Sequence, residues 1–249
     1  MSSKGRAAAG YVPDPTGFFS TQPQVTRAIL PFLGIQPGMR ILEPSCGNGA
    51  IGKVLREQYG NTITIIGVEI DKKRAAQARK ARVHSPVTGC TLPVFDDVIH
   101  SDFYKLTPEG IGAPFSRIIT NPSFSIWLPF AEHCFLFGSD TKLLLPLNAV
   151  ASKKRSDWWR SHPAHLRILS KRPSFAISIK CLAATNAGRK LGLARCEYQE
   201  LVALDAKIPK LCLDCGEKIV TTRSDSSEYA WVTWRPDIIR GLWDVIGFP

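Results

Sequence analysis

The sequence has no long apolar run. Its longest hydrophobic stretches are interrupted by proline, glycine or charged residues, and none approaches the roughly 18 apolar residues that a membrane-spanning helix requires. The first ten residues contain no apolar core of the length found in secretory signal peptides. We therefore expect a cytoplasmic protein in which residues 1–16 form a flexible basic lead-in.

Internal repeats and low-complexity tracts are absent as well. With 249 residues, 44% of them hydrophobic and 21% charged, the chain can bury a substantial core, which excludes wholesale disorder. At roughly 150 residues per domain, this length indicates one large domain, alone or with a small insertion.

Acidic residues are scarce relative to basic ones. The chain has 21 Asp and Glu residues against 32 Lys and Arg residues, which gives a formal net charge of +11. This balance favours a polyanionic partner such as nucleic acid, because phosphates neutralised by basic side chains release counterions. A basic enzyme without such a partner is the alternative. The seven cysteines are an odd number and, in a cytosolic chain, indicate thiols or metal ligands rather than disulfides.

Apolar runs rich in β-branched residues alternate with helical patterns over residues 21–147. The predicted strands are Met39–Glu43, Thr62–Glu69, Val98–Ser101, Arg117–Thr120 and Lys142–Leu147. The predicted helices are Ala50–Tyr59, Asp71–Val83, Ile126–Phe137 and an earlier helix over residues 21–33 that Thr21 would cap. Strands and helices alternating at this spacing predict βαβ units and a mostly parallel, doubly wound α/β sheet.

The character of the chain changes after Leu147. Residues 151–172 hold seven basic side chains, opposed only by Asp157. Two further strands are predicted at His165–Ser170 and Tyr229–Trp234. Residues 176–227, between these strands, show weak periodicity and carry four of the seven cysteines. We therefore predict an insertion between two neighbouring strands.

A glycine-rich turn follows the first predicted strand. Gly47, Gly49 and Gly52 match the G-x-G-x-x-G spacing of nucleotide-binding turns. Glu43, four residues before the first glycine, would repel a pyrophosphate and attract an ammonium group. Glu69 ends the second strand, where it can accept hydrogen bonds from both ribose hydroxyls. A ligand with a ribose, a positive amino group and no phosphate fits best, and S-adenosylmethionine is such a ligand.

These motifs resemble the class I S-adenosylmethionine-dependent methyltransferases, and within them the DNA adenine-N6 branch. Glu43 with Pro44 before the glycines resembles the first motif of that branch. Residues 18–23 resemble the segment that closes over the methionine moiety, and residues 101–103 lie where the family contacts the adenine ring and amino group of the cofactor. The cofactor-binding residues that the resemblance implies are Phe19, Thr21, Glu43, Pro44, Gly47, Gly49, Glu69, Asp102, Phe103 and Asn121.

The resemblance covers residues 17–175 and resumes at residues 228–234. It implies a Rossmann-like, mixed seven-stranded sheet with a small cysteine-containing insertion between the last two strands. The expected domains are a methyltransferase domain at residues 17–175 plus 228–249 and an insertion at residues 176–227 that contacts nucleic acid or forms a zinc knuckle. As a whole the chain is similar to small phage- or prophage-encoded adenine methyltransferases, so we expect it in the cytoplasm of a bacterial or phage-infected host cell.

The fourth predicted strand leads into Asn121, Pro122, Ser123 and Phe124. The family signature is Asn, Asp or Ser followed by two prolines and an aromatic residue, so Ser123 replaces the second proline. The resemblance implies that the Asn121 side-chain carbonyl and the Pro122 backbone carbonyl accept the N–H groups of an adenine amine and direct its lone pair toward the methyl sulfonium. Phe124 would stack on the target base. A loop in which Asn121 and Pro122 only start a turn is the alternative.

Base capture is expected after the sixth strand, and DNA contact is expected over the basic stretch of residues 153–172. Phe175 stands where the family packs an aromatic residue against the flipped base, and Arg172 lies near it in the sequence. Lys153, Lys154 and Arg155 are expected to contact phosphates. The order of the motifs resembles the gamma arrangement of adenine methyltransferases. It leaves little more than residues 176–227 for a domain that reads sequence, so we expect short or relaxed target specificity.

Four cysteines in the predicted insertion form a candidate metal site. Cys181, Cys196, Cys212 and Cys215 include one Cys-x-x-Cys-Gly, which is typical of a zinc knuckle. A structural zinc would stabilise an insertion too short to build its own core. Thiols without a metal are the alternative, since only one of the two pairs is tightly spaced.

Other functions stay open at this point. An RNA adenine methyltransferase uses the same tetrapeptide, and a nucleic-acid-binding protein that lost activity through Ser123 would keep most of the same motifs. A protein glutamine methyltransferase would bring an extra N-terminal domain and would not need a charge of +11. Glu43 with Pro44 disfavours a nicotinamide oxidoreductase. The sequence therefore predicts a DNA adenine-N6 methyltransferase that uses S-adenosylmethionine, with RNA as the alternative substrate.

Overall fold

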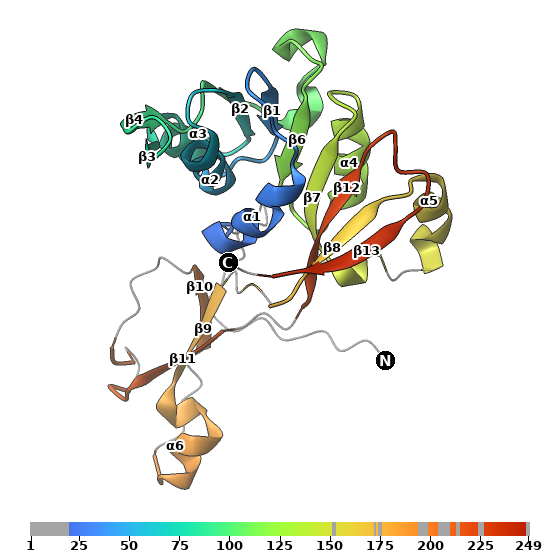
Figure 1. Ribbon diagram of the computed structural model, residues 1–249. Helices are drawn as coiled ribbons and strands as arrows, with labels where there is room; N and C mark the ends of the chain where they lie inside the picture. The colour runs from blue at the N-terminus through green and yellow to red at the C-terminus, as the bar shows by residue number, and fades with distance from the viewer. Residues whose placement is uncertain are drawn as a thin grey trace. The chain divides into compact units, whose positions relative to one another are not determined.

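Two compact units make up the part of the chain that the structure, a computed structural model, describes (Figure 1). The described residues are 20–150, 153–171, 173, 176–193, 199–203, 210–212, 215–223 and 227–247. Residues 20–173 with 227–247 form the larger unit, and residues 176–223 form the smaller one. Each unit has its own sheet.

A mixed sheet forms the centre of the larger unit. Its strands are β1 (Arg40–Glu43), β2 (Thr64–Glu69), β5 (Asp97–His100), β6 (Arg117–Thr120), β7 (Thr141–Pro146), β8 (His165–Leu169), β12 (Tyr229–Trp234) and β13 (Leu242–Ile246). They lie in the order β13-β8-β12-β7-β6-β1-β2-β5. Strand β12 is antiparallel to β7 and β8, and every other pair in this sheet is parallel. The sheet is therefore doubly wound from β1, with a single reversed strand.

Short helices connect these strands. The α-helices of the larger unit are α1 (Pro23–Ile29), α2 (Ala50–Tyr59), α3 (Lys72–Lys80), α4 (Trp127–Phe135) and α5 (Ser156–Ser161). The single-turn helices are η1 (Leu30–Phe32), η2 (Phe103–Lys105), η3 (Glu109–Ile111), η4 (Leu147–Ala149) and η5 (Lys153–Arg155). Within the described ranges, none of the helices combines the length and the apolar character needed to span a bilayer.

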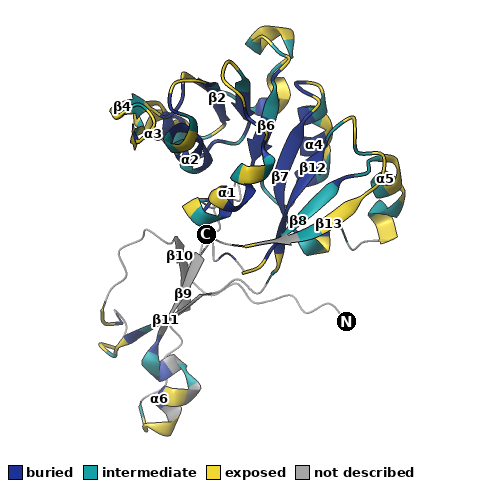
Figure 2. Cartoon of the chain, viewed as in Figure 1, coloured by how far each residue is buried: buried dark blue, intermediate teal, exposed yellow. Residues whose placement is uncertain are grey.

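Both faces of the central strands are covered. Every residue of β7 and β12 is buried (Figure 2), as expected for strands with packing on both sides. On one face Leu143 and Val232 join a core cluster with Phe130 of α4. On the other face the Trp231 indole Nε1 donates a hydrogen bond of 2.9 Å to the Val25 carbonyl of α1. The sheet therefore forms a rigid base for the loops at its edges.

The strand count corrects the expected topology. The sheet has eight strands instead of seven, because β13 adds to its edge in parallel with β8. In the sequence, the smaller unit is inserted between β8 and β12. These are not the last two strands of the larger sheet, because β13 follows them. Strand β13 lacks the buried pattern that marks a strand in a sequence, since Leu242 is 58% and Trp243 is 73% exposed.

Two local expectations are also wrong. The helix predicted to reach Val83 ends at Lys80, and a two-stranded hairpin of β3 (Arg82–Ser85) and β4 (Cys90–Pro93) follows it. The chain turns extended at Ala81, with ψ of 133°. The N-cap residue of α1 is Gln22, whose side chain makes no capping hydrogen bond. Thr21, the expected cap, contacts a different part of the molecule.

The smaller unit is built on three antiparallel strands in the order β10-β9-β11. Their bounds are β9 (Ala176–Cys181), β10 (Gln199–Ala203) and β11 (Ile219–Arg223), and the unit also contains η6 (Leu182–Ala184) and α6 (Asn186–Lys190). Its buried apolar side chains include Ala183 and Ile219.

Candidate active site

The carboxyl ends of four parallel strands meet at one edge of the larger sheet. Strand β1 ends at Glu43, β2 at Glu69, β5 at His100 and β6 at Thr120. The winding direction reverses between β1 and β6, since β2 and β5 continue to one side and β7 to the other. In open α/β sheets, ligands bind in the crevice outside the strand ends at such a switch point. We therefore expect a ligand-binding site in the loops after these strands.

The loop after β1 makes a tight turn into α2. The Cys46 N–H donates to the Val68 carbonyl at 2.9 Å, and the Gly49 N–H donates to the Cys46 carbonyl at 2.8 Å. Gly49 caps α2 with a φ of 88°, a left-handed conformation that favours glycine. A Cβ atom on Gly52 would lie 2.7 Å from the Phe95 ring, so glycine is required for this close packing. The expected strand, glycine turn and helix are confirmed.

Glu43 is almost fully buried beside this turn. Its Oε2 accepts a hydrogen bond of 3.0 Å from the Gly52 N–H. Burial raises the pKa of the Glu43 carboxyl well above its usual range, and the Glu69 carboxylate raises it further against the opposing effect of the Gly52 bond. A positively charged ligand would offset both contributions. The pair of carboxylates therefore fits a cation better than a phosphate.

Glu69 is also buried, and its carboxylate is heavily engaged. Oε2 accepts from the Gly47 N–H at 2.9 Å, and Oε1 accepts from the Asp71 N–H at 2.8 Å. The Arg74 guanidinium also donates to Oε1 at 3.2 Å. A carboxylate offers about four acceptor sites, so these contacts leave capacity for a further donor such as a ribose hydroxyl.

The loop after β5 begins with the polar residues Ser101 and Asp102. Asp102 caps η2 by accepting a hydrogen bond of 3.1 Å from the Tyr104 N–H. The Phe103 ring is buried and packs against Phe130 and His133, with ring centroids 5.3 and 4.7 Å apart. Its side chain therefore contributes to the core, and a cofactor contact at this position falls to Asp102 or to the backbone.

Asn121, directly after β6, is held by the segment that precedes α1. Its Nδ2 donates a hydrogen bond of 3.1 Å to the Oγ1 of Thr21, 100 residues earlier in the chain. Its Oδ1 is buried and has no hydrogen-bond partner among the described residues. Buried polar atoms are almost always paired, so this oxygen is a candidate acceptor for a ligand.

An open cavity lies beside the tetrapeptide. Its volume is about 460 Å³, within the range of small-molecule sites. The Phe124 ring stands on its wall and contacts Tyr229, with ring centroids 5.5 Å apart. The lining residues are Phe124, Ser125, Trp127, Pro146, Asn148, Ala149, Arg155, Ser227 and Tyr229. The lining therefore combines aromatic and polar side chains.

Solved structures share this architecture. A protein of Listeria monocytogenes assigned to the class I S-adenosylmethionine-dependent methyltransferases matches 89% of this chain and 62% of its own, with a TM-score of 0.50 and 12% identity. A predicted O-methyltransferase of Agrobacterium tumefaciens matches 91% of this chain and 86% of its own, with a TM-score of 0.51 and 12% identity. The chain has the class I S-adenosylmethionine-dependent methyltransferase fold.

Sequence comparisons agree with the methyltransferase fold. The family model of the protein-L-isoaspartate (D-aspartate) O-methyltransferases matches residues 13–119, a range that includes both buried carboxylates and ends before Asn121. The type II methyltransferase M.CvrRI of Paramecium bursaria Chlorella virus XZ-6E is 35% identical over 99 residues, which are 38% of this chain. This chain covers 26% of that relative. The expected resemblance to methyltransferases is confirmed.

The basic residues near this cavity have different environments. Lys153 and Lys154 in η5 are exposed. Arg155 instead donates to the carbonyls of Ala149 at 2.9 Å and Asn148 at 3.0 Å. The guanidinium of Arg155 thus has a structural role at the cavity wall, and the two lysines are the exposed members of this group.

The partly buried tryptophans of α5 pack against the core of the larger unit. The Trp127 ring lies 5.5 Å from Trp158 and 5.4 Å from Trp159. The Trp158 Nε1 also donates a hydrogen bond of 2.8 Å to Glu132. This cluster fastens α5, and with it η5, to α4.

Several predicted site residues lie outside the described residues. They are Phe19, Arg172, Phe175 and Cys196. Of the four cysteines expected to bind a metal, Cys181, Cys212 and Cys215 come together in the smaller unit.

Two contacts of the site were not expected from the sequence. Thr21 was expected to cap the helix, whereas its hydroxyl accepts a hydrogen bond from Asn121; the cofactor contact expected of Thr21 stays a prediction. Tyr229 begins β12, which is antiparallel to β7 and places Tyr229 opposite Pro146. Because the amino end of a reversed strand lies at the carboxyl end of its neighbour, the topology could have placed Tyr229 at this edge, although its contact with Phe124 depends on the tertiary structure.

Proposed function

We propose that the protein transfers a methyl group from S-adenosylmethionine to the N6 amine of adenine in DNA, with short or relaxed sequence specificity. The observation that carries this proposal is the buried Asn121 Oδ1, which accepts no hydrogen bond from the described residues. A buried acceptor without a donor costs about 1–3 kcal/mol. The site therefore favours a substrate that brings an N–H group, and an exocyclic amine is such a substrate.

The tetrapeptide would prepare this amine for attack. An adenine amine is a poor nucleophile, because its lone pair is delocalised into the ring. The Asn121 Oδ1 and the Pro122 carbonyl would each accept one N–H and favour a pyramidal nitrogen with an available lone pair. Ser123 supplies neither acceptor, and its hydroxyl lies 3.1 Å from that of Ser125. The replacement of the second proline therefore leaves both acceptors in place.

The glycine turn and the two buried carboxylates would hold the cofactor. S-adenosylmethionine, when bound, supplies an electrophilic methyl group on a positively charged sulfonium. Glu43 and Glu69 end adjacent strands, and the raised pKa of Glu43 indicates a site whose electrostatics favour a cation. No general base is needed before attack. The acceleration would come mainly from orientation, which supplies about 7–11 kcal/mol in favourable cases.

The cavity beside Phe124 would accept the target base. Stacking of a base on an aromatic ring contributes about 1–3 kcal/mol, and the Phe124 and Tyr229 rings are both on the cavity wall. A base inside a duplex cannot reach such a cavity unless it leaves the stack. The arrangement therefore supports single bases that are flipped out or already unpaired.

Charge and relatives support a nucleic acid as the substrate. The net charge is +11, and the exposed Lys153 and Lys154 follow the cavity residues Asn148 and Ala149 in the chain. Similarity to the type II methyltransferase M.CvrRI supports DNA over RNA. RNA adenine is the alternative, because the same acceptor pair would bind the same amine there.

A second candidate substrate comes from the family model. Its match to residues 13–119 favours methyl esterification of an isoaspartyl carboxylate in proteins. An ionised carboxylate accepts hydrogen bonds and donates none. It would therefore leave Asn121 Oδ1 without a donor, and the two acceptor oxygens would repel each other. The matched range also ends before Asn121. Both facts favour the amine.

The proposal is tested by offering labelled S-adenosylmethionine with double- and single-stranded DNA, the same two forms of RNA, and an isoaspartyl peptide. Mass spectrometry of the digested products identifies the methylated unit. We expect N6-methyldeoxyadenosine from at least one form of DNA. The variant N121A should lose this product, whereas N61A, which replaces an exposed asparagine before β2, should retain it.

Other outcomes are equally informative. Methylation of RNA alone would support the alternative substrate, and an esterified peptide would support the second candidate. Cofactor binding without methylation of any acceptor would indicate a nucleic-acid-binding protein without activity. A methylation map of treated DNA that contains one long recognition sequence would contradict the relaxed specificity.

Zinc has no part in the proposed reaction. Methyl transfer from a sulfonium to an amine needs no Lewis acid, and the three clustered cysteines belong to the smaller unit.

A further inference from the structure

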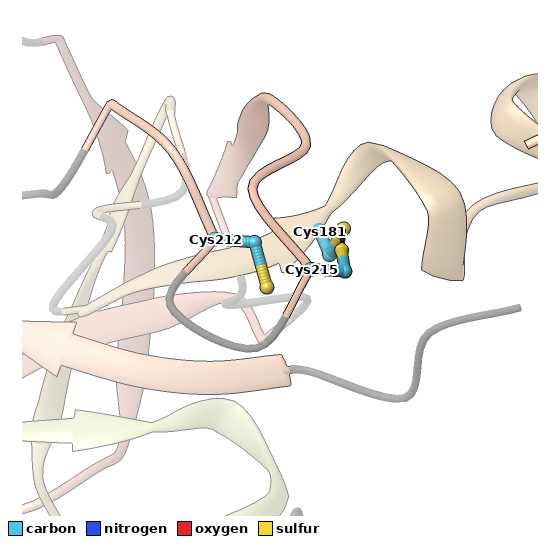
Figure 3. Close-up of side chains that lie close together, drawn as sticks. All are labelled: Cys181, Cys212 and Cys215. Atoms are coloured by element: carbon cyan, nitrogen blue, oxygen red, sulfur yellow. Dashed lines mark hydrogen bonds between the residues drawn. The ribbon is translucent and has the colours of Figure 1, made fainter. Parts of the chain in front are cut away.

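Three cysteines of the smaller unit lie close together (Figure 3). Cys181 ends β9, and Cys212 and Cys215 lie in the turn between Leu211 and Lys218. The three Sγ atoms all lie within 4.8 Å of one another, and those of Cys181 and Cys215 are 3.4 Å apart. They come from segments more than 30 residues apart, so the spacing of the tight pair alone could not place the third.

Backbone hydrogen bonds hold the turn in this position. The Cys212 N–H donates to the Glu217 carbonyl at 2.7 Å, and the Gly216 N–H donates to the Cys212 carbonyl at 2.9 Å. The Leu182 N–H donates to the Lys218 carbonyl at 2.8 Å, which fastens the turn to the residue after Cys181. The thiols are therefore brought together by the backbone on both sides.

The sulfur geometry fits a metal better than a disulfide. A disulfide needs an S–S distance of about 2.05 Å, well below the 3.4 Å between Cys181 and Cys215. Zinc–thiolate bonds of about 2.3 Å in a tetrahedron place sulfurs about 3.8 Å apart. This value lies between the 3.4 Å that separates the Cys181 and Cys215 sulfurs and the 4.8 Å within which all three sulfurs lie.

We infer that Cys181, Cys212 and Cys215 bind one Zn²⁺ in a structural site that joins the end of β9 to the turn. Each thiol would lose its proton to solvent and bind as a thiolate. Small units with few buried apolar side chains commonly need such a staple. The inference rests on these three ligands and on a turn already shaped to present them, and it is independent of the methyltransferase activity.

Metal content of the full-length chain tests the site directly. The protein is purified in reductant without chelator, and its zinc is measured by mass spectrometry. We expect about one zinc per chain. After metal removal, Co²⁺ should restore the site and produce the d–d absorption of tetrahedral cobalt with thiolate charge-transfer bands.

Two serine variants separate the site from the other thiols. Cys215 is exposed, so C215S should keep the fold of the larger unit while losing most of the zinc and the tetrahedral cobalt spectrum. C90S, which replaces an exposed cysteine on β4 of the larger unit, should bind zinc like the wild type. The cobalt spectrum of the wild-type protein tests the site even where a variant at buried Cys181 or Cys212 does not fold.

Two results would overturn the inference. They are failure of the reduced, metal-depleted protein to take up Zn²⁺ or Co²⁺, and equal zinc content in C215S and C90S.

Discussion

The two sides of the strand-end crevice differ in how their polar groups are satisfied. On the side of β1 and β2, the buried carboxylates of Glu43 and Glu69 accept hydrogen bonds from the backbone of the glycine turn. On the side of β6, Asn121 Oδ1 is buried without a partner among the described residues. The first side is therefore shaped before any ligand binds. The second carries a cost in folding free energy that a substrate N–H would recover.

The substitution with the largest expected effect is N121A, on the unsatisfied side. We expect turnover to fall about 10²–10³-fold, the usual consequence of losing one preorganised polar contact to the reacting centre. The dissociation constant for S-adenosylmethionine should barely change, and the melting temperature should change little, because removal of the unpaired buried oxygen offsets loss of the hydrogen bond to Thr21. Equal losses in cofactor affinity and turnover would contradict the division into two sides.

Glu69 should show the opposite pattern. In E69A, cofactor affinity should fall by about 1.5–3 kcal/mol, the scale of hydrogen bonds to a charged group, which corresponds to roughly 10–150-fold. Turnover at saturating cofactor should survive. Calorimetry on E69Q, the conservative variant, separates loss of ribose binding from damage to the turn. An unchanged dissociation constant for S-adenosylmethionine in E69A would show that another residue contacts the ribose.

The exposed lysines should affect nucleic-acid binding and little else. In K153A/K154A, each lost phosphate contact should reduce the log–log salt slope of DNA binding by about 0.9, equally for all sequences. R155A should instead lower thermal stability, because Arg155 donates to the Ala149 and Asn148 carbonyls. A salt slope that matches the wild type in the double variant would assign the phosphate contacts to another surface.

Thr21 supports the side of Asn121, and its replacement should have a smaller effect. The isosteric T21V removes the acceptor for Asn121 Nδ2, a hydrogen bond worth about 1 kcal/mol, so turnover should fall roughly fivefold with the affinity for cofactor nearly unchanged. T91V, at an exposed position on β4, is the matched control. Identical kinetics for T21V and T91V would show that Asn121 is oriented without this contact.

The pH dependence of stability sharpens the account of the satisfied side. Because the pKa of Glu43 is raised in the folded protein by burial and by Glu69, ionising it costs folding free energy in the absence of cofactor. That cost is absent below the unfolded pKa of about 4.3 and grows as pH rises above it toward the folded pKa. E43Q should therefore gain melting temperature over the wild type, by about 2–4 °C per kcal/mol removed, with a gain that grows over this pH range. A gain independent of pH would contradict the assignment.

The sequence predicted the elements that carry strong local signals. Ala50–Tyr59, Arg117–Thr120 and Tyr229–Trp234 have their expected bounds, since each combines apolar periodicity with clear breaks at both ends. Strand β13 was missed, because it is an exposed edge strand whose pairing with β8 is decided only in the folded chain. Edge strands give weak signals for this reason.

The site shows the same contrast between features with local sequence signals and features that depend on tertiary contacts. The glycine turn and its carboxylates lie within one βαβ unit, so their proximity could be expected from spacing. The bond between Thr21 and Asn121 joins residues 100 positions apart, and the missing partner of Asn121 Oδ1 is a property of tertiary packing. Neither could be derived from a sequence pattern.

The central claim is that Asn121 Oδ1 is the acceptor for an adenine amine. It is tested most directly by locating the transferred methyl group on the base, using fragment spectra of nucleosides from DNA treated with equal amounts of wild type and N121A. The account predicts N6-methyladenine from the wild type and at least a hundredfold less, about 10² or more, from N121A. Methyl groups on a ring nitrogen, or equal amounts of N6-methyladenine from both proteins, would contradict it.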